Sequence, residues 1–228
     1  MGFYQTSPIY RFNSNYFTKK HKNDTSFMIK RITVNSGWSG ENLLSELQKS
    51  TAKTLPYFDD LKLNRGWMTL WGKMYMDNSN IILTPDPGET GATILLDGTR
   101  LWENYSVKAI VTSKNQGSVY VWTRFQDDNN NIACNFGNGF VHIDQTLQGI
   151  KNVIQGVNNP QLGIPSGEFT VEARVKGRNV SCFLNGINIV QTFFADPSLD
   201  KGGIGFKTWE KNPNLTELTI KQLEVKPL

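Results

Sequence analysis

Aromatic and hydrogen-bonding side chains alternate with small or apolar ones along residues 118–126, SVYVWTRFQ. Period-two alternation indicates a β-strand with two different faces, one of which would carry Tyr120, Trp122, Arg124 and Gln126. The C–H face of a sugar stacks on a flat aromatic ring, and the planar donor fork of an arginine suits sugar hydroxyls. We therefore predict that this face holds a saccharide. The alternative is that a loop or second layer covers Trp122, with Arg124 as its cover.

Four more residues are candidates for the same surface. Trp209 is predicted to face outward on a strand over residues 202–209, where it would offer a second stacking platform. The acids Glu103, Asp127 and Glu210 are assigned to the rim, where carboxylates accept hydrogen bonds from hydroxyl groups. Together with the four residues of the first strand, they make up the predicted carbohydrate-binding site.

The run DDNNN, residues 127–131, has oxygen-bearing side chains that suit either a calcium ion or a tight turn. An EF-hand-type loop starting at Asp127 would need Gly at its sixth position and Glu at its twelfth. This chain has Ile132 and Asn138 there. We therefore predict a hairpin turn first, and an ion site of another kind in this turn stays open.

Few other residues of the sequence are candidates for metal binding or for thiol chemistry. A structural calcium ion near Asp59 or Asp60 is the metal site that we consider, and no cofactor is expected to be required. Cys134 and Cys182 lie in apolar strand-like runs without a CxxC partner, so we interpret them first as buried small hydrophobes. A single disulfide between them stays open but is not required by the sequence.

The elements that must position these residues are short strands. From Tyr57 onward, stretches rich in Val, Ile, Phe, Trp and Thr are separated by Gly, Asn and Asp clusters, and helical periodicity is nearly absent. The clearest stretches are residues 105–114, 118–126, 169–177, 180–193, 202–209 and 218–225. Asn185-Gly186 is a strong signal for a two-residue hairpin turn. The pattern predicts an all-β fold, an antiparallel jelly-roll sandwich, for residues 57–228.

Residues 1–56 form a different, N-terminal extension. A strand is predicted over residues 27–34, and a helix capped by Ser39 over residues 39–50. The extension is too short and too polar to build a core of its own. We expect it either to pack on the sandwich or to be the tail of a missing domain, with the boundary at residues 53–56.

Positive charge is concentrated in this extension. Eight Lys and Arg against three Asp and Glu give residues 1–56 a net charge of +5, whereas the remaining 16 basic and 17 acidic residues sum to −1. A neutral body offers no basic field for phosphates, so nucleic acid is not an expected partner. No apolar stretch approaches the roughly 18 residues of a membrane span, and no signal peptide is recognised, so membrane insertion is not expected.

Several stretches resemble the concanavalin A-like jelly-roll domains of the laminin-G-like type: YSVKAIVTSKNQGSVYVWTRFQDDNNN, GEFTVEARVKGRNVSCFLNGINIV, KGGIGFKTW and LTIKQLEVKPL. This group includes the 3-keto-disaccharide hydrolase domain and fructan-binding modules. The resemblance covers about residues 57–228 and implies a sandwich fold, a carbohydrate partner, the family arginine at Arg124 and the turn acid at Asp127 or Asp128. Ile132 stands where the family often has Tyr, so no particular sugar is implied.

Residues 1–50 are similar to the tail of a NodB-type polysaccharide deacetylase, through MIKRITVNSGWSGENLLSELQ. That resemblance implies a missing catalytic domain on the N-terminal side and an extracellular or cell-surface location. The metal-binding Asp and the His-x-x-x-His pair of that chemistry are absent, since the histidines are His21 and His142, far apart in sequence. This chain by itself would not deacetylate a substrate by that mechanism.

Taken together, the residues predict a non-catalytic carbohydrate-binding module of a polysaccharide-acting protein, with a polysaccharide or oligosaccharide as partner. A laminarinase-like glycosidase would carry its carboxylates as E-x-D-x-x-E on one strand, and this spacing does not occur. Two alternatives stay open. One is a glycoside hydrolase of the 3-keto-disaccharide hydrolase type that uses Glu103, Arg124 and Glu210, and the other is a purely structural or interaction sandwich.

Overall fold

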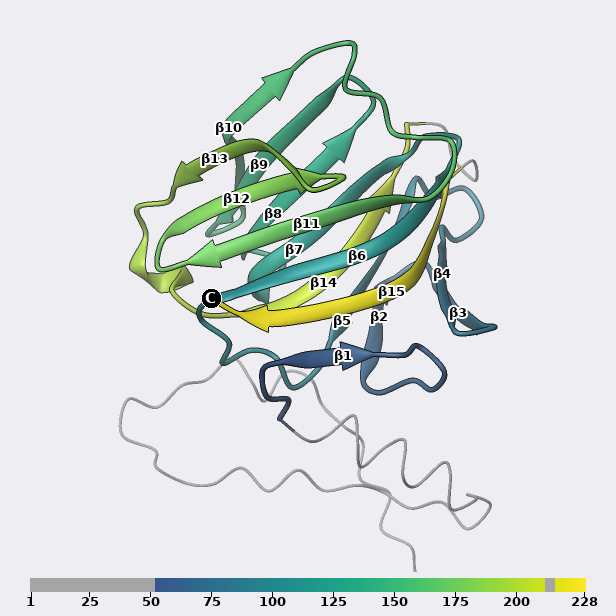
Figure 1. Cartoon of the computed structure of the whole chain (residues 1–228), viewed down its shortest axis with the longest axis horizontal. Coiled ribbons are helices and arrows are strands. Elements are labelled where there is room, and N and C mark those ends of the chain that lie inside the picture. Colours follow the sequence, from purple (N-terminus) through teal and green to yellow (C-terminus); the bar gives the residue numbers. More distant parts are fainter. Residues whose placement is uncertain (1–51, 212–215) are drawn as a thin grey trace, which may run out of the picture.

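The computed structural model describes residues 52–211 and 216–228, in which two antiparallel β-sheets pack face to face as a sandwich (Figure 1). The all-β class and the jelly-roll architecture predicted from the sequence are confirmed. Within these residues the one helical element is a 3-10 turn, η2 (Pro197–Leu199), and no helix is long and apolar enough to cross a membrane. The strand predicted over residues 27–34 and the helix predicted over residues 39–50 lie outside the described residues.

Sheet A has eight strands, in the order β13-β12-β11-β6-β15-β4-β3 with β1 paired to β15. Its strands are β1 (Tyr57–Asp59), β3 (Lys73–Asp77), β4 (Asn80–Thr84), β6 (Tyr105–Lys114), β11 (Phe169–Lys176), β12 (Asn179–Leu184), β13 (Ile187–Phe193) and β15 (Glu217–Pro227). Sheet B has seven strands, in the order β10-β9-β8-β7-β14-β5-β2. Its strands are β2 (Trp67–Trp71), β5 (Gly91–Leu96), β7 (Ser118–Asp127), β8 (Asn130–Gly137), β9 (Phe140–Leu147), β10 (Ile150–Asn158) and β14 (Gly203–Trp209). The strand predicted to carry the site, β7, is therefore a central strand of sheet B, between β8 and β14.

The two turns predicted from Asn and Asp residues are both hairpins. Asn185 and Gly186 have φ values of 50° and 80°, the two positive angles that a type I′ turn requires. The DDNNN run also closes a hairpin, because β7 ends at Asp127 and β8 begins at Asn130. Asp127 Oδ1 accepts hydrogen bonds from the Asn129 backbone N–H at 2.8 Å and from Asn130 Nδ2 at 2.9 Å, so the first acid of the run holds the turn.

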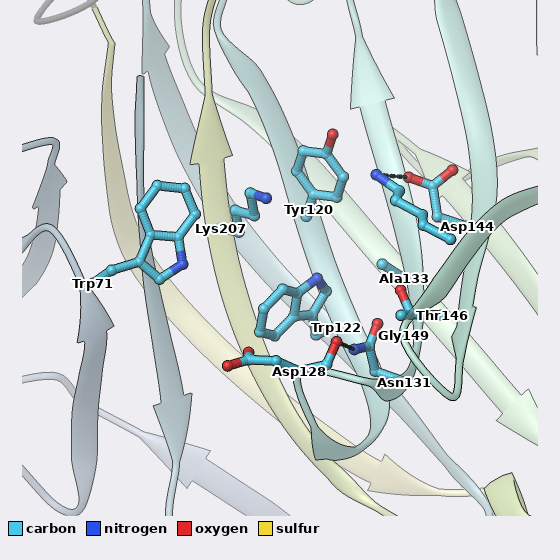
Figure 2. A pocket seen from close by; sticks show the side chains of 11 residues that line it. Trp71, Tyr120, Trp122, Asp128, Asn131, Ala133, Asp144, Thr146, Gly149 and Lys207 are labelled. Atoms are coloured by element: carbon cyan, nitrogen blue, oxygen red, sulfur yellow. Dashed lines mark hydrogen bonds and ion pairs between the residues drawn. The ribbon is translucent and has the colours of Figure 1, made fainter. Parts of the chain in front are cut away.

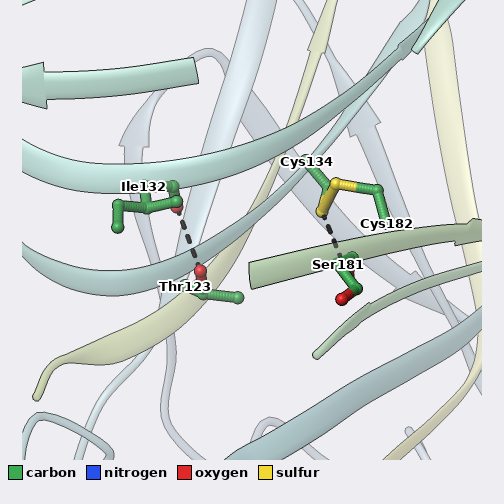
Figure 3. Close-up of a disulfide and its surroundings, with 5 residues drawn as sticks. All are labelled: Thr123, Ile132, Cys134, Ser181 and Cys182. Atoms are coloured by element: carbon green, nitrogen blue, oxygen red, sulfur yellow. Dashed lines mark hydrogen bonds between the residues drawn. A yellow bond between two sulfur atoms is a disulfide. The ribbon is translucent and has the colours of Figure 1, made fainter. Parts of the chain in front are cut away.

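A disulfide joins the two sheets through the core. Cys134 lies on β8 of sheet B and Cys182 on β12 of sheet A, and their sulfur atoms are bonded to each other (Figure 3). Both residues are fully buried. Both cysteines are buried as predicted, and the disulfide that the sequence left open is formed. The disulfide fixes strand β8 of sheet B against sheet A.

The side chains of strand β7 do not alternate regularly between the two faces of the sheet up to the end of the strand. Its pairing with β8 shifts between Thr123 and Asp127, and Arg124 has a positive φ of 53°, which is the geometry of a β-bulge. A Cβ on Gly202 of the facing segment would lie 2.2 Å from the Arg124 carbonyl carbon, so only glycine fits against the bulge. The extra residue reverses the faces beyond it. The outward face predicted for Arg124 and the core-facing side predicted for Phe125 are therefore wrong.

Candidate functional site

Strand register gathers side chains from separate strands into rows on the outer face of sheet B. Lys207 on β14 pairs with Thr93 on β5 and with Tyr120 on β7, and Tyr120 pairs in turn with Asn135 on β8. The next row along the strands runs through Leu95, Gly205, Trp122, Ala133 and Asp144. Because Gly205 has no side chain, the Leu95 side chain packs over its backbone: a Cβ on Gly205 would lie 2.5 Å from Leu95 Cδ2.

A pocket of about 280 Å³ occupies this face (Figure 2). Its lining residues are Trp71, Tyr120, Trp122, Asp128, Asn131, Ala133, Asp144, Thr146, Gly149, Lys151 and Lys207. They come from β2, β7, β8, β9, β10 and β14 and from the turns at the ends of β7 and β9, so the pocket forms only when sheet B is assembled. The pocket combines three large aromatic residues with acidic and basic side chains and with amide and hydroxyl groups.

The floor of the pocket is a small apolar cluster separate from the main core. It consists of Leu95, Tyr120, Trp122, Phe125 and Ala133, all buried. The rings of Trp122 and Phe125 are stacked with centroids 4.8 Å apart and planes 9° apart. The bulge in β7 makes this contact, since it turns Phe125 to the outer face. Trp122 is therefore held from behind by a second ring and has little freedom to reorient.

Trp71 and Lys207 form the opposite side of the pocket. Lys207 Nζ lies 5.0 Å from the centroid of the Trp71 ring and 5.1 Å from that of Tyr120, so the ammonium sits between two aromatic faces (Figure 2). Burial lowers the pKa of Lys207, and the nearby Lys151 lowers it further. Burial also raises the pKa of the Tyr120 hydroxyl, so this phenol stays neutral at physiological pH.

Asp144 carries the most buried charge of the pocket, with an exposed fraction of 3%. Its Oδ2 atom accepts from Asn135 Nδ2 at 3.1 Å and pairs with Lys151 Nζ at 2.9 Å. Its Oδ1 atom is buried and has no hydrogen-bond partner among the described residues. Burial lowers the pKa of Lys151, but Tyr120 and Asp144 outweigh that effect, so the net shift is upward. Asp144 is thus a fixed carboxylate with one acceptor oxygen to spare.

The turn between β7 and β8 closes the lower end of the pocket. Asn131 Nδ2 donates to the backbone oxygens of Asp127 at 3.1 Å and Asp128 at 3.3 Å, which fixes the amide against the turn. Asp128 itself lines the pocket below Trp122 (Figure 2). The hairpin run thereby supplies two residues, Asp128 and Asn131, to the lining of the pocket.

Two of the four residues predicted on β7, Tyr120 and Trp122, line the pocket, each with 8% of its surface exposed. Arg124 is fully buried on the other side of the bulge, where its guanidinium donates to the backbone oxygens of Trp102, Asp200 and Gly177. Gln126 donates to the backbone oxygens of Ser198 and Lys201, away from the pocket. The structure therefore separates these two polar residues from the aromatic pair.

The predicted second platform and rim residues do not line the pocket either. Trp209 is 38% exposed at the end of β14, next to Gly91. Asp127 holds the hairpin turn, and Glu103 is exposed outside the sheets. Glu210 accepts a hydrogen bond from the Lys211 backbone N–H at 2.8 Å. Because Glu103, Arg124 and Glu210 line no common pocket, the geometry does not favour the hydrolase alternative built on them.

Asp59 and Asp60 do not fit a calcium site. Asp59 is fully buried, and its carboxylate accepts from Trp67 Nε1 at 3.0 Å, Tyr57 Oη at 2.8 Å and the Leu61 backbone N–H at 3.0 Å. Asp60 pairs with Arg65 at 3.3 Å. Across residues 52–211 and 216–228, no three His, Cys, Asp or Glu side chains are grouped closely enough to share a metal ion. Asp59 serves as a buried hydrogen-bond acceptor that joins β1 to β2.

Four important pocket residues were not predicted as site residues: Trp71, Asp144, Lys151 and Lys207. Alternation along residues 202–209 places Lys207 on the same outward face as Trp209, but alternation does not say which strands are neighbours. Trp71 and Lys151 belong to β2 and to β10, the two edge strands of sheet B. The pairing of distant strands is what brings these side chains to β7.

Comparisons with known proteins agree with this architecture. No protein-family model and no curated protein matches the chain. The carbohydrate-binding module CBM66 from Bacillus subtilis has 15% sequence identity and a TM-score of 0.59, with 71% of this chain and 95% of that one covered. A β-glucanase from Bacillus licheniformis has 10% identity and a TM-score of 0.59, with 77% and 100% covered.

A third solved structure is the exoplasmic/lumenal domain of VIP36 in a form bound to Ca²⁺ and Man3GlcNAc, with 10% identity, a TM-score of 0.55, and 71% and 84% of the two chains covered. This chain has the concanavalin A-like jelly-roll fold. Identities of this size establish the fold alone, so the activities of these proteins are not transferred here. The deacetylase resemblance of residues 1–50 lies outside the described residues and gains no support from the comparisons.

Proposed function

We propose that this concanavalin A-like domain is a non-catalytic carbohydrate-binding module whose site is the outer-face pocket of sheet B. The observation that carries the proposal is the combination of aromatic surfaces and fixed polar groups in one pocket, above all Trp71 and Trp122 beside the spare acceptor Asp144 Oδ1. A saccharide needs both kinds of group at once, since its C–H faces are apolar and its hydroxyls require partners.

Each part of the pocket matches one part of such a ligand. Trp71 and Trp122 offer ring surface for stacking, with Trp122 supported from behind by Phe125. Asp144 Oδ1 accepts from a hydroxyl group, which relieves a buried oxygen that otherwise has no partner. Lys207 donates hydrogen bonds. Most of these groups are already fixed by contacts within the protein, so little ordering is needed when a ligand binds.

The known proteins of similar fold support the class of ligand without defining it. One is a carbohydrate-binding module, and another was solved with an oligosaccharide of mannose and N-acetylglucosamine bound. The inter-sheet disulfide favours an oxidising compartment, which agrees with the extracellular or cell-surface location expected from the sequence. A polysaccharide or oligosaccharide in that compartment is the proposed partner.

Trp71→Ala tests the stacking wall. We expect it to weaken binding about fivefold, because a stacking ring contributes on the order of 1 kcal/mol. Trp71 is half-buried at the edge of sheet B, so the thermal midpoint should change little. The measurement is calorimetry against oligosaccharides first selected on a glycan panel, with circular dichroism as the check on folding.

Trp209→Ala is the matched control, since it removes the same ring from the same sheet outside the pocket. Its affinity should stay within about twofold of the wild type. Equal loss in both variants, or loss only in Trp209→Ala, would contradict the site. Failure of the folded wild type to bind any glycan would contradict the proposed function itself. Release of reducing ends from the same glycans would instead assign glycoside hydrolysis.

A further inference from the structure

The two lysines of the pocket differ in how their charges are satisfied. Lys151 pairs with Asp144 at 2.9 Å. Lys207 has neither a hydrogen bond nor an ion pair from its ammonium among the described residues, although its side chain is half-buried. The rings of Trp71 and Tyr120 attract the cation, but a ring face does not replace an oxygen acceptor for three N–H donors. Lys207 is therefore a positioned cation with donor capacity to spare.

The acids that line the pocket do not pair with the Lys207 ammonium. Asp144 gives its Oδ2 atom to Lys151 and Asn135, and it forms no ion pair with Lys207. Asp128 also lines the pocket, but it forms no ion pair with Lys207 in the described part of the chain. The charged groups around Lys207 are therefore Lys151, which is paired with Asp144, and the two acids, neither of which forms an ion pair with Lys207.

We propose that the ligand of this pocket is an acidic saccharide, whose carboxylate or sulfate group binds Lys207 while one of its hydroxyls binds Asp144 Oδ1. This inference rests on the proposed function and narrows it to a chemical class. An anion would supply the strong acceptor that Lys207 lacks, in a setting where aromatic side chains reduce access of water. A simple anion without hydroxyls would not serve the buried Asp144 oxygen, which needs a donor.

The decisive comparison uses the wild-type chain and pairs of probes that differ only at the acidic group. Oligosaccharides of galacturonate, glucuronate and mannuronate are each titrated beside their methyl-esterified forms, and a sulfated galactan oligosaccharide is titrated beside its desulfated form. We expect one acidic probe to bind about tenfold more tightly than its neutral form at low salt, with the difference shrinking at high salt. Which acidic probe binds decides between carboxylate and sulfate.

Lys207→Met then tests the residue. It keeps most of the apolar stem between the two rings and removes the charge, so the acidic and the neutral probe should bind this variant with the same affinity, within about twofold of each other. Lys108→Met is the matched control, because it makes the same change in net charge at an exposed position on β6 of sheet A. It should leave the preference intact. Lys207→Gln replaces Lys207→Met if that variant does not fold.

The outcomes separate the inference from the function on which it rests. Equal binding of acidic and neutral probes by the wild type overturns the acidic-ligand proposal and leaves carbohydrate binding standing. A preference for the acidic probe that survives in Lys207→Met also overturns it, because the charge is then read elsewhere. Absence of binding to every saccharide, by a chain shown to be folded, overturns both.

Discussion

Replacing Cys134 and Cys182 together by alanine is expected to lower the free energy of unfolding by about 4 kcal/mol. The two residues are 48 positions apart, and in the chain-entropy model a cross-link of that span restricts the unfolded state by about this amount. The link also joins opposite sheets rather than neighbouring strands, so its loss frees two parts of the sandwich that share no backbone ladder. Urea unfolding of the double variant beside the wild type measures the difference.

Reduction of the wild type provides the control for this prediction. With a thiol reductant, the wild type should approach the double variant in its unfolding midpoint, whereas the variant should not respond. Free-thiol titration shows that reduction is complete. A double variant within about 1 kcal/mol of the oxidised wild type would mean that packing alone holds the sheets together. Because Cys134 lies between Ala133 and Asn135 on the strand under the pocket, saccharide affinity should be measured on the same samples.

The strands could be predicted because their signals are local. Residues 105–114 alternate in type between clear turn signals, and the structure gives β6 the same bounds. A type I′ turn requires two positive φ angles, which Asn-Gly adopts more easily than most residue pairs. The dipeptide Asn185-Gly186 was therefore enough to predict the hairpin. For such elements, the information about conformation lies in the residues themselves.

The site could be predicted only in part because its assembly is not local. Alternation brought Tyr120 and Trp122 to one face, and both line the pocket. Lys207 and Asp144 reach them through strand pairings of β14 with β7 and of β8 with β9, and the sequence of β7 contains no information about those pairings. The disulfide is a similar case. Two cysteines in apolar strands are equally consistent with free thiols until the two sheets are known to face each other.

Arg124→Met should be the most destabilising single change near the site, with a loss of about 3–5 kcal/mol in the free energy of unfolding. The guanidinium is fully buried and donates to three backbone oxygens, of Trp102, Asp200 and Gly177, and a hydrogen bond that involves a charged group contributes about 1.5–3 kcal/mol. Methionine keeps much of the volume but supplies no donor. Urea unfolding measures the loss, with Arg174→Met as control. Arg174 pairs with Glu172 from a side chain that is 45% exposed, so a smaller loss than for Arg124→Met is expected.

The same variant decides what an arginine before the Asp-Asn turn does in this chain. If Arg124 contacted the sugar, the Arg124→Met variant would lose affinity for saccharide with little loss of stability. As a residue that fixes the bulge, it would lose stability, while molecules that remain folded keep Phe125 stacked under Trp122 and bind saccharide within about threefold of the wild type. We expect the second result, because the bulge turns the arginine into the protein and turns a phenylalanine out to support the pocket floor. A stable Arg124→Met protein with no affinity would contradict this account and restore the role predicted from alternation.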